Sequence, residues 1–430
     1  GDLTVGSSKY PAIFINFDFR LGIFGWIDMK DPSVPKNIGL RDQQMALRWV
    51  NRNIAAFGGD PKRVTLMGQS EGSGIIMAHM VAPGSQGLFS RISMHSPPAD
   101  LWRRDVNHLR TKFILNQLRC GSPFTAAVLE CLRCLPANKI WDADWVSEEL
   151  SHDLGSPGWQ KEFAGLMGFL PGKNPKHVPG YLGWHAVVDG ETLPGEPQVL
   201  IQSGRWSRVP VLVTTARNES LGCFPGGDFS NNMLSLTLWY FLKQGDIKHV
   251  TDLYSGTLRA SGHGVPAGNA LLHQLVTDKV WACDILGFAR TVADSGGEVR
   301  VGVFTHGPRW DPSGVRGNIV CESGTASCHS ADMLYILPQD AKRRGIPLWA
   351  TTEWQFANRY RDEVLKFVSG EESAWAPYNS KNKTVTFYNS DGPQAVPGWK
   401  SDICNVLDAS MGDALPAFLQ DRGRLALARK

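Results

Sequence analysis

The chain has 430 residues, of which 42% are hydrophobic and 20% charged, a balance typical of a globular protein with a large core. Its net charge of +3 is too small to favour a nucleic acid or an anionic membrane as a partner. No apolar run reaches the length of about 18 residues that a membrane-spanning helix needs, and residues 409–430 are interpreted as a C-terminal tail.

The beginning of the chain alternates between strand and helix patterns. Residues 12–17 form a nearly continuous apolar run, which predicts a strand buried on both faces of a parallel sheet. A helix should follow, because apolar residues recur at helical spacing on one face: Leu40, Leu47, Val50 and Ile54. Residues 58–61 (Gly-Gly-Asp-Pro) should end this helix. Residues 63–67 predict a second strand, and the helix after it should run to about Met80. This alternation predicts an α/β protein, whose ligands bind at the carboxyl ends of the strands.

The later segments are less regular. Residues 152–185 are rich in Gly, Pro and Trp and are interpreted as loop, whereas residues 208–215 and 299–304 predict further buried strands. Residues 341–369 have the pattern of a helix. Because the chain contains no internal repeat and no low-complexity linker, residues 1–408 are interpreted as one domain with long insertions.

Residues 68–72 read Gly-Gln-Ser-Glu-Gly and stand between the predicted second strand and its helix. Strand, sharp turn and helix form the context in which G-x-S-x-G presents a nucleophilic serine. The turn strains the backbone of Ser70, and glycines on both sides are expected to leave room for it. The pattern alone also arises by chance in an ordinary surface turn, but its flanking elements favour an exposed nucleophile.

Six further segments resemble the type-B carboxylesterase and cholinesterase family of α/β-hydrolases: residues 19–25, 37–43, 46–50, 53–61, 87–89 and 187–190. They are similar to the family's NYRLGxFG and NxGLxDQ stretches, to the helix and loop that follow, and to its GLF and PVVDG stretches. The likeness runs from about residue 10 to about residue 408. It implies a mostly parallel central sheet with helices on both faces and long insertions.

The resemblance also implies roles for single residues. Ser70 matches the nucleophile, Glu219 the acid of the NxDEG stretch, and His329 the base of the HxxDxxY stretch. This chain order is typical of the fold. The histidine takes the proton of the weakly nucleophilic hydroxyl, and the carboxylate orients the imidazole. The backbone N–H of Glu71 matches an oxyanion-hole donor. Taken alone, His329 could be structural and Glu219 a surface charge.

The site departs from the family pattern at several positions. Glu71 replaces the usual Ala, so its carboxylate either opposes the oxyanion or points away along the helix. Gln69 replaces a common Glu, which makes a preference for cationic substrates less expected. Asp18 stands where the family has Asn, and Ser220 where it has Gly. The glycosylation signal at Asn218 touches the matched acid, so we expect Asn218 to be unmodified.

No HGGG-like loop, which in the family supplies the other oxyanion N–H groups, precedes Ile13. In this fold the strand before that loop lies between the strands predicted at residues 12–17 and 63–67. We therefore expect that N-terminal strands are absent from this chain. We also expect the chain as given to fold poorly or to be nearly inactive.

The chain has eight cysteines. Cys120 and Cys131 resemble the family's second disulfide, which implies an oxidising compartment and a secreted or secretory-lumen protein; two buried thiols are the alternative. Cys321 and Cys328 flank the histidine loop and are candidates for another pair. The partners of the others are open: Cys134, Cys223, Cys283 and Cys404. A metal site is not favoured, because no second CxxC or paired histidines accompany residues 131–134.

The leading hypothesis is a serine carboxylic-ester hydrolase that acts through an acyl-enzyme on small or apolar esters. It needs a small-molecule ester as its partner and no metal or organic cofactor. The alternative is a non-catalytic adhesion or binding protein of the same family. A peptidase or lipase also stays open, because specificity on this fold depends on its insertions. Which ester is cleaved and the oligomeric state are not indicated.

Overall fold

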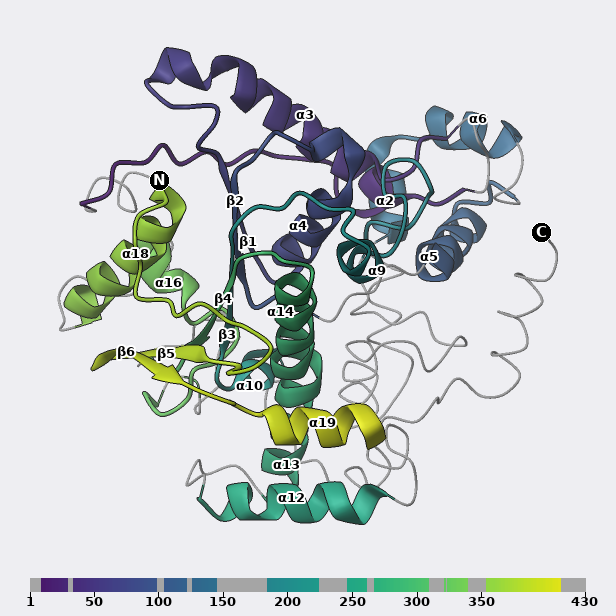
Figure 1. Cartoon of the computed structure of the whole chain (residues 1–430). Helices are drawn as coiled ribbons and strands as arrows, with labels where there is room; N and C mark the ends of the chain where they lie inside the picture. The colour runs from purple at the N-terminus through teal and green to yellow at the C-terminus, as the bar shows by residue number, and fades with distance from the viewer. Residues whose placement is uncertain are drawn as a thin grey trace.

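The computed structural model describes residues 9–29, 34–98, 104–121, 126–144, 184–223, 246–260, 267–308, 321, 323–338 and 353–410. Within these residues, six strands form one sheet in the order β1 to β6 (Figure 1). The first five strands are parallel, and β6 is antiparallel to β5. The strands are β1 (Thr65–Gln69), β2 (Arg91–His95), β3 (Val211–Ala216), β4 (Val299–Phe304), β5 (Val385–Asn389) and β6 (Gly392–Val396).

Helices cover both faces of the sheet, as Figure 1 shows. One face carries α4 (Glu71–Val81), α9 (Pro197–Gln202) and α14 (Asp284–Asp294). The other carries α16 (Met333–Ile336) and α18 (Glu353–Ser369), which pack through aromatic side chains: Phe304, Tyr335, Phe356, Tyr360 and Trp375. The predicted α/β class with helices on both faces is therefore confirmed.

The remaining helices surround these layers. Those near the start of the chain are α2 (Gly22–Trp26), α3 (Ile38–Asn53), α5 (Arg104–Gln117) and α6 (Ala126–Cys134), with short 3-10 helices at Ile54–Phe57 and Pro83–Ser85. The later ones are α10 (Glu219–Cys223), α12 (Ile247–Ala260), α13 (Ala267–Val276), the π-helical segment Thr277–Cys283 and α19 (Ser401–Ser410). No described helix is long and apolar enough to cross a membrane.

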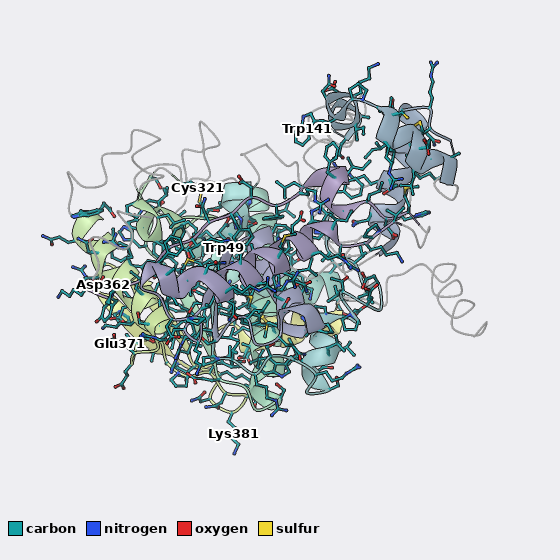
Figure 2. All side chains as sticks on the ribbon, turned by 90° about the horizontal axis from the view of Figure 1, so that it is seen from above. Trp49, Trp141, Cys321, Asp362, Glu371 and Lys381 are labelled. Atoms are coloured by element: carbon teal, nitrogen blue, oxygen red, sulfur yellow. A yellow bond between two sulfur atoms is a disulfide. The ribbon has the colours of Figure 1, made fainter. Side chains whose placement is uncertain are left out.

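Hydrophobic spacing determines which face of α3 meets the core. Leu40 and Leu47 are buried, whereas Met45 and Trp49 on the opposite side are exposed. Figure 2 shows Trp49 on α3 over the middle of the molecule and Trp141 at the projecting end near α6. The helix predicted from the apolar spacing is thus confirmed as α3. The prediction for residues 341–369 is confirmed over α18, while residues 341–352 lie outside the described part.

The predicted strand at residues 12–17 is wrong. These residues form no strand, and their apolar side chains are partly exposed: Ile13 46%, Phe14 38%, Ile15 37% and Phe17 40%. A strand needs a neighbour to satisfy its backbone N–H and C=O groups. Among the described residues the sheet ends at β1, so residues 12–17 have no adjacent strand to pair with. An apolar run records a preference for burial but does not supply that partner.

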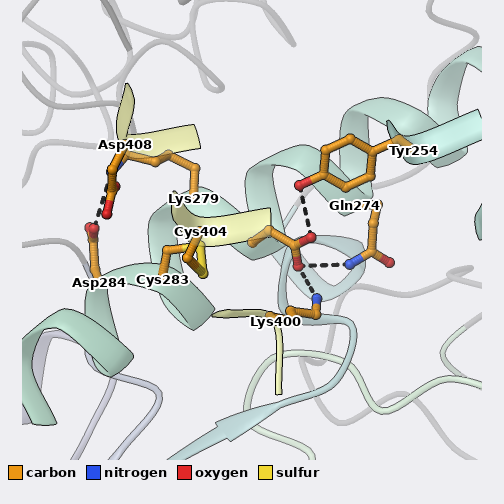
Figure 3. The surroundings of a disulfide bond; sticks show 9 residues. Tyr254, Gln274, Lys279, Cys283, Asp284, Lys400, Cys404 and Asp408 are labelled. Atoms are coloured by element: carbon orange, nitrogen blue, oxygen red, sulfur yellow. Dashed lines mark hydrogen bonds and ion pairs between the residues drawn. A yellow bond between two sulfur atoms is a disulfide. The ribbon is translucent and has the colours of Figure 1, made fainter. Parts of the chain in front are cut away.

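Three disulfides are present in the described residues. Cys120 is bonded to Cys131, as the resemblance implies, and Cys321 to Cys328. The third joins Cys283 to Cys404 over a sequence separation of 121 residues, and so attaches α19 to the π-helical segment (Figure 3). Cys134 is exposed and free, and the side chain of Cys223 lies outside the described part.

A buried ion pair lies beside the third disulfide, as Figure 3 shows. The carboxylate of Asp278 is fully buried and accepts hydrogen bonds from Tyr254 Oη and Gln274 Nε2, each at 2.8 Å. It also pairs with the ammonium group of Lys400, whose side chain is 13% exposed. One carboxylate therefore joins three elements: α12, α13 and the turn before α19.

Asp278→Ala is expected to lower the free energy of unfolding by about 3–5 kcal/mol, because Lys400 then stays buried without its counter-charge, and burial already lowers the pKa of Lys400 from 10.5 to about 7. Denaturant unfolding measures this loss. The double variant Asp278→Ala/Lys400→Met, which removes both charges, should recover most of it. A double variant no more stable than Asp278→Ala would contradict the assignment of the loss to an uncompensated charge.

His79 on α4 should make the fold sensitive to acid. Its ring is buried between Gln43 Oε1 and Ser85 Oγ, each at 2.8 Å, and burial lowers its pKa from 6.5 to about 4. The unfolded chain then binds a proton that the folded chain excludes. The contribution of His79 to the free energy of unfolding is fully present above pH 6.5. It is lost as the pH falls toward 4, by about 1.4 kcal/mol per pH unit.

Denaturant titrations between pH 4 and pH 7 test this expectation. His79→Gln should flatten the dependence, because glutamine carries no titrating group. His249→Gln, at an exposed position on α12, is the control and should leave the slope as it is. An unchanged slope in His79→Gln would show that other groups dominate.

Candidate active site

Ser70 occupies the turn between β1 and α4. Its backbone has φ 54° and ψ −125°, a strained combination for any residue other than glycine. Its N–H donates to the carbonyl of His95 at 2.8 Å, and its own carbonyl accepts from the N–H groups of Ser73 and Gly74 at 2.8 and 3.1 Å. The surrounding backbone thus holds the strained conformation, at the carboxyl end of β1.

The glycines on either side of Ser70 differ in importance. A methyl group at Gly68 would lie 2.4 Å from the carbonyl oxygen of Gly72, so only glycine fits there. A methyl group at Gly72 would meet no described atom within 4 Å, so the prediction that both glycines leave necessary room is wrong for Gly72. The close approach occurs at the strand side of the turn, where α4 folds back over β1.

Glu219 and His329, matched by the resemblance to the acid and the base, are in contact. His329 Nδ1 lies 2.6 Å from Glu219 Oε2. Glu219 is the first residue of α10, just after β3, and its carboxylate is fully buried. Its other oxygen accepts from Thr215 Oγ1 at 2.8 Å and from the N–H of Ala216 at 2.6 Å. The carboxylate is therefore fixed in one orientation toward the imidazole.

The loops that carry the pair are joined to each other. The N–H of Asn218 donates to the carbonyl of Ser327 at 2.8 Å, and Asn218 Oδ1 accepts from the N–H of Ser327 at 3.3 Å. The Cys321–Cys328 disulfide ends at the residue before His329, and the ring of buried Trp281 lies 5.5 Å from the imidazole. These contacts fix the imidazole relative to Glu219.

Gln69 contacts the nitrogen that a serine nucleophile would need. Its Nε2 lies 3.0 Å from His329 Nε2 and donates to Ser330 Oγ at 2.7 Å. If His329 donates from Nδ1 to Glu219, its Nε2 is free to accept from the Gln69 amide. The Oγ of Ser70 has no hydrogen-bond partner among the described residues. The structure thus brings Glu219 and His329 together. Ser70 follows Gln69 in the chain, and the Gln69 amide competes with the serine hydroxyl for His329 Nε2.

Gln69→Ala is expected to speed the reaction of Ser70 with a fluorophosphonate by about fivefold, the equivalent of one neutral hydrogen bond of about 1 kcal/mol. Alanine removes the amide that occupies His329 Nε2 and leaves that lone pair to the serine hydroxyl. The second-order rate constant of labelling measures the change. A tenfold slower reaction would show instead that Gln69 holds His329 in its working position.

The side chain of Glu71 is bonded to a residue that the sequence did not single out. Glu71 Oε1 lies 2.9 Å from His185 Nδ1. The backbone N–H of Glu71 belongs to the first turn of α4, where N–H groups have no partner inside the helix, and it suits an oxyanion donor. The only signal for His185 was its place just before the PVVDG-like stretch, and that does not specify a contact.

A mostly parallel sheet with helices on both faces, and a serine turn at the end of its first described strand, define an α/β-hydrolase. Two solved structures agree in fold. A PNB esterase has a TM-score of 0.67 and 21% identity, over 91% of this chain and 73% of that chain. A thermophilic PNB esterase has a TM-score of 0.68 and 23% identity, over 91% of this chain and 72% of that chain. Residues 7–397 match the model of the carboxylesterase family, and the chain belongs to that family.

Curated relatives include enzymes and one protein not named as an enzyme. Juvenile hormone esterase of Tribolium castaneum is 40% identical over 150 residues, which cover 31% of this chain and 26% of the relative. Esterase FE4 of Myzus persicae is 32% identical over 213 residues, which cover 49% of this chain and 33% of the relative. Neuroligin-2 of Homo sapiens is 24% identical over 405 residues, which cover 86% of this chain and 45% of the relative. The chain thus spans less than half the length of these relatives, and the resemblance seen in the sequence is confirmed.

Proposed function

We propose that this protein is a serine carboxylic-ester hydrolase that works through an acyl-enzyme. Ser70 Oγ attacks the ester carbonyl while His329 Nε2 takes its proton. His329 then gives the proton to the leaving alcohol as the acyl-enzyme forms. Water next attacks the acyl carbonyl while His329 takes its proton, and His329 returns that proton to Ser70 Oγ as the acid leaves. Glu219 orients the imidazole and stabilises its charged form.

The observation that carries this proposal is the buried Glu219–His329 pair, 2.6 Å apart, on the loops that follow β3 and β4, in the same parallel sheet whose β1 ends at the strained Ser70 turn. A surface glutamate beside a structural histidine would need neither complete burial nor the two further donors that hold Glu219 Oε1. Strain at a serine that ends a strand also supports a functional turn, because such conformations persist where the surroundings enforce them.

We further propose small or apolar esters as substrates. Gln69 brings an uncharged amide rather than a carboxylate next to His329, and the Glu71 carboxylate is hydrogen-bonded to His185. The group that contacts His329 Nε2 thus carries no negative charge that would favour a cationic substrate. The three disulfides support folding in an oxidising compartment, and we propose that the protein is secreted or enters the secretory lumen.

Reaction with an irreversible probe needs only one event per active site and is therefore a more sensitive test than steady-state hydrolysis.

The test is to label the protein with a fluorophosphonate and to trap the acyl-enzyme by acid quench during hydrolysis of p-nitrophenyl butyrate. Peptide mass mapping then locates both adducts. We expect both on Ser70, and neither after denaturation or after blocking with an organophosphate. A folded protein without either adduct would instead favour the non-catalytic binding protein, and adducts on another serine would remove Ser70 from the mechanism.

A further inference from the structure

The carboxylate of Glu71 belongs to the same residue whose backbone N–H suits the oxyanion. In the proposed reaction, negative charge develops on the carbonyl oxygen next to that N–H. A second negative charge nearby would oppose it. The side chain therefore has to be held away from the oxyanion while the N–H stays in place.

The structure shows where the Glu71 carboxylate lies. Its Oε1 is 2.9 Å from His185 Nδ1, and a methyl group at Gly74 would lie 3.9 Å from its Oε2 and 3.9 Å from the ring of Pro98. The carboxylate thus lies beside the next turn of α4. It points along the helix, as one of the two alternatives drawn from the sequence had it.

His185 has few alternatives to this contact. Its side chain is 13% exposed, and its Nε2 is buried without a hydrogen-bond partner among the described residues. The Glu71 carboxylate is therefore the one polar group of the described chain that the ring bonds. A histidine placed only to fill space would leave no reason for a half-exposed glutamate to fold back onto it.

The backbone on both sides of His185 is fixed by two buried asparagines. Asn107 Nδ2 donates to the carbonyl of His185 at 2.7 Å. Asn37 holds Val187 through both its N–H and its carbonyl, each at 2.8 Å. The imidazole is thus presented to Glu71 from a rigid segment and does not depend on the mobility of a long side chain.

We propose that His185 is a positioning residue for oxyanion formation at Ser70: its bond to Glu71 keeps the carboxylate away from the oxyanion and leaves the residue 71 N–H free to donate. The inference rests on the proposed ester hydrolysis. It explains how the chain tolerates an acid at the position after the nucleophile, because the Glu71 carboxylate is held by its bond to His185.

A double-mutant cycle tests the proposal. The variants are His185→Ala, Glu71→Ala, the double variant, and His185→Asn, whose amide can donate to the carboxylate from nearly the place of Nδ1. For each, the rate constant of Ser70 phosphonylation and kcat and KM for p-nitrophenyl butyrate are measured, with the melting temperature as a check on folding.

We expect His185→Ala to slow phosphonylation and kcat by about tenfold or more with little change in KM, because a released carboxylate opposes the oxyanion and not substrate binding. In the Glu71→Ala background, His185→Ala should slow phosphonylation and kcat by less than about twofold, since no carboxylate is left to restrain. His185→Asn should recover most of the rate.

Two results would overturn the proposal. If His185→Ala costs the same with and without Glu71, the residue acts through the fold. If it costs nothing in a protein that phosphonylates at Ser70, the carboxylate needs no restraint. Failure of the proposed function looks different: the parent protein and every variant would then be folded and would not react at Ser70.

Discussion

Replacing Ser70 with alanine is expected to lower kcat for p-nitrophenyl butyrate by about 10⁶-fold, the loss found when a serine hydrolase of another fold loses its nucleophile. Alanine removes the only group that can form the acyl-enzyme, so the residual rate comes from water attacking a bound ester. The substitution adds no atom to a strained turn that Ser70 holds through its backbone alone, and the melting temperature should change little.

Ser90→Ala provides the matched control. Ser90 precedes β2, at the opposite end of the sheet, where its Oγ donates to the carbonyl of Val64 at 3.2 Å. Its loss should leave kcat within about twofold, because it removes one neutral hydrogen bond far from the chemistry. A Ser70→Ala protein that is folded and hydrolyses the ester at the parent rate would end the case for a Ser70 acyl-enzyme.

The second large effect is expected for Glu219→Gln, which should lower kcat by about 10⁴-fold, as the equivalent acid-to-amide change does in serine proteases. The amide keeps the size of the side chain but can donate a hydrogen bond to His329 Nδ1. The imidazole then carries its proton on Nε2 and cannot accept one from Ser70. Binding should be less affected than turnover, since Glu219 is buried away from solvent.

The measurement is kcat and KM for Glu219→Gln beside Glu298→Gln. Glu298 pairs with Arg300 at 2.7 Å at the start of β4, and its side chain is 49% exposed, so the same chemical change there should leave the rate unaltered. A loss of less than about tenfold in Glu219→Gln would show that orientation of His329 by this carboxylate contributes little.

The sequence predicted those parts of the fold that local patterns specify. β1, β3 and β4 follow from short apolar runs, and α3 from its periodic apolar face. β2 was missed because its five residues, Arg-Ile-Ser-Met-His, carry only two apolar side chains. Residues 12–17 show the reverse error, because strand formation depends on a neighbour that no local pattern describes.

The residues of the candidate site were likewise predicted where a local motif specifies them, and their contacts were not. Motifs and resemblance named Ser70, Glu219 and His329 and the backbone of Glu71. They did not reveal that Gln69 contacts His329 across 260 residues, or that Glu71 bonds His185 across 114. Such pairs depend on which strands are adjacent and on how the loops after them fold, and those relations exist only in three dimensions.

The bonds between the Asn218 and Ser327 loops have a consequence for how errors in the site would appear. The acid and the base are carried by two loops that hydrogen bonds join to each other, whereas the serine belongs to the turn between β1 and α4, which contacts the histidine loop through the side chain of Gln69. A displacement of the serine turn relative to these two loops changes the distance from serine to imidazole and leaves the distance from imidazole to carboxylate intact. An intact acid–base pair is therefore no sign that the serine is aligned with it.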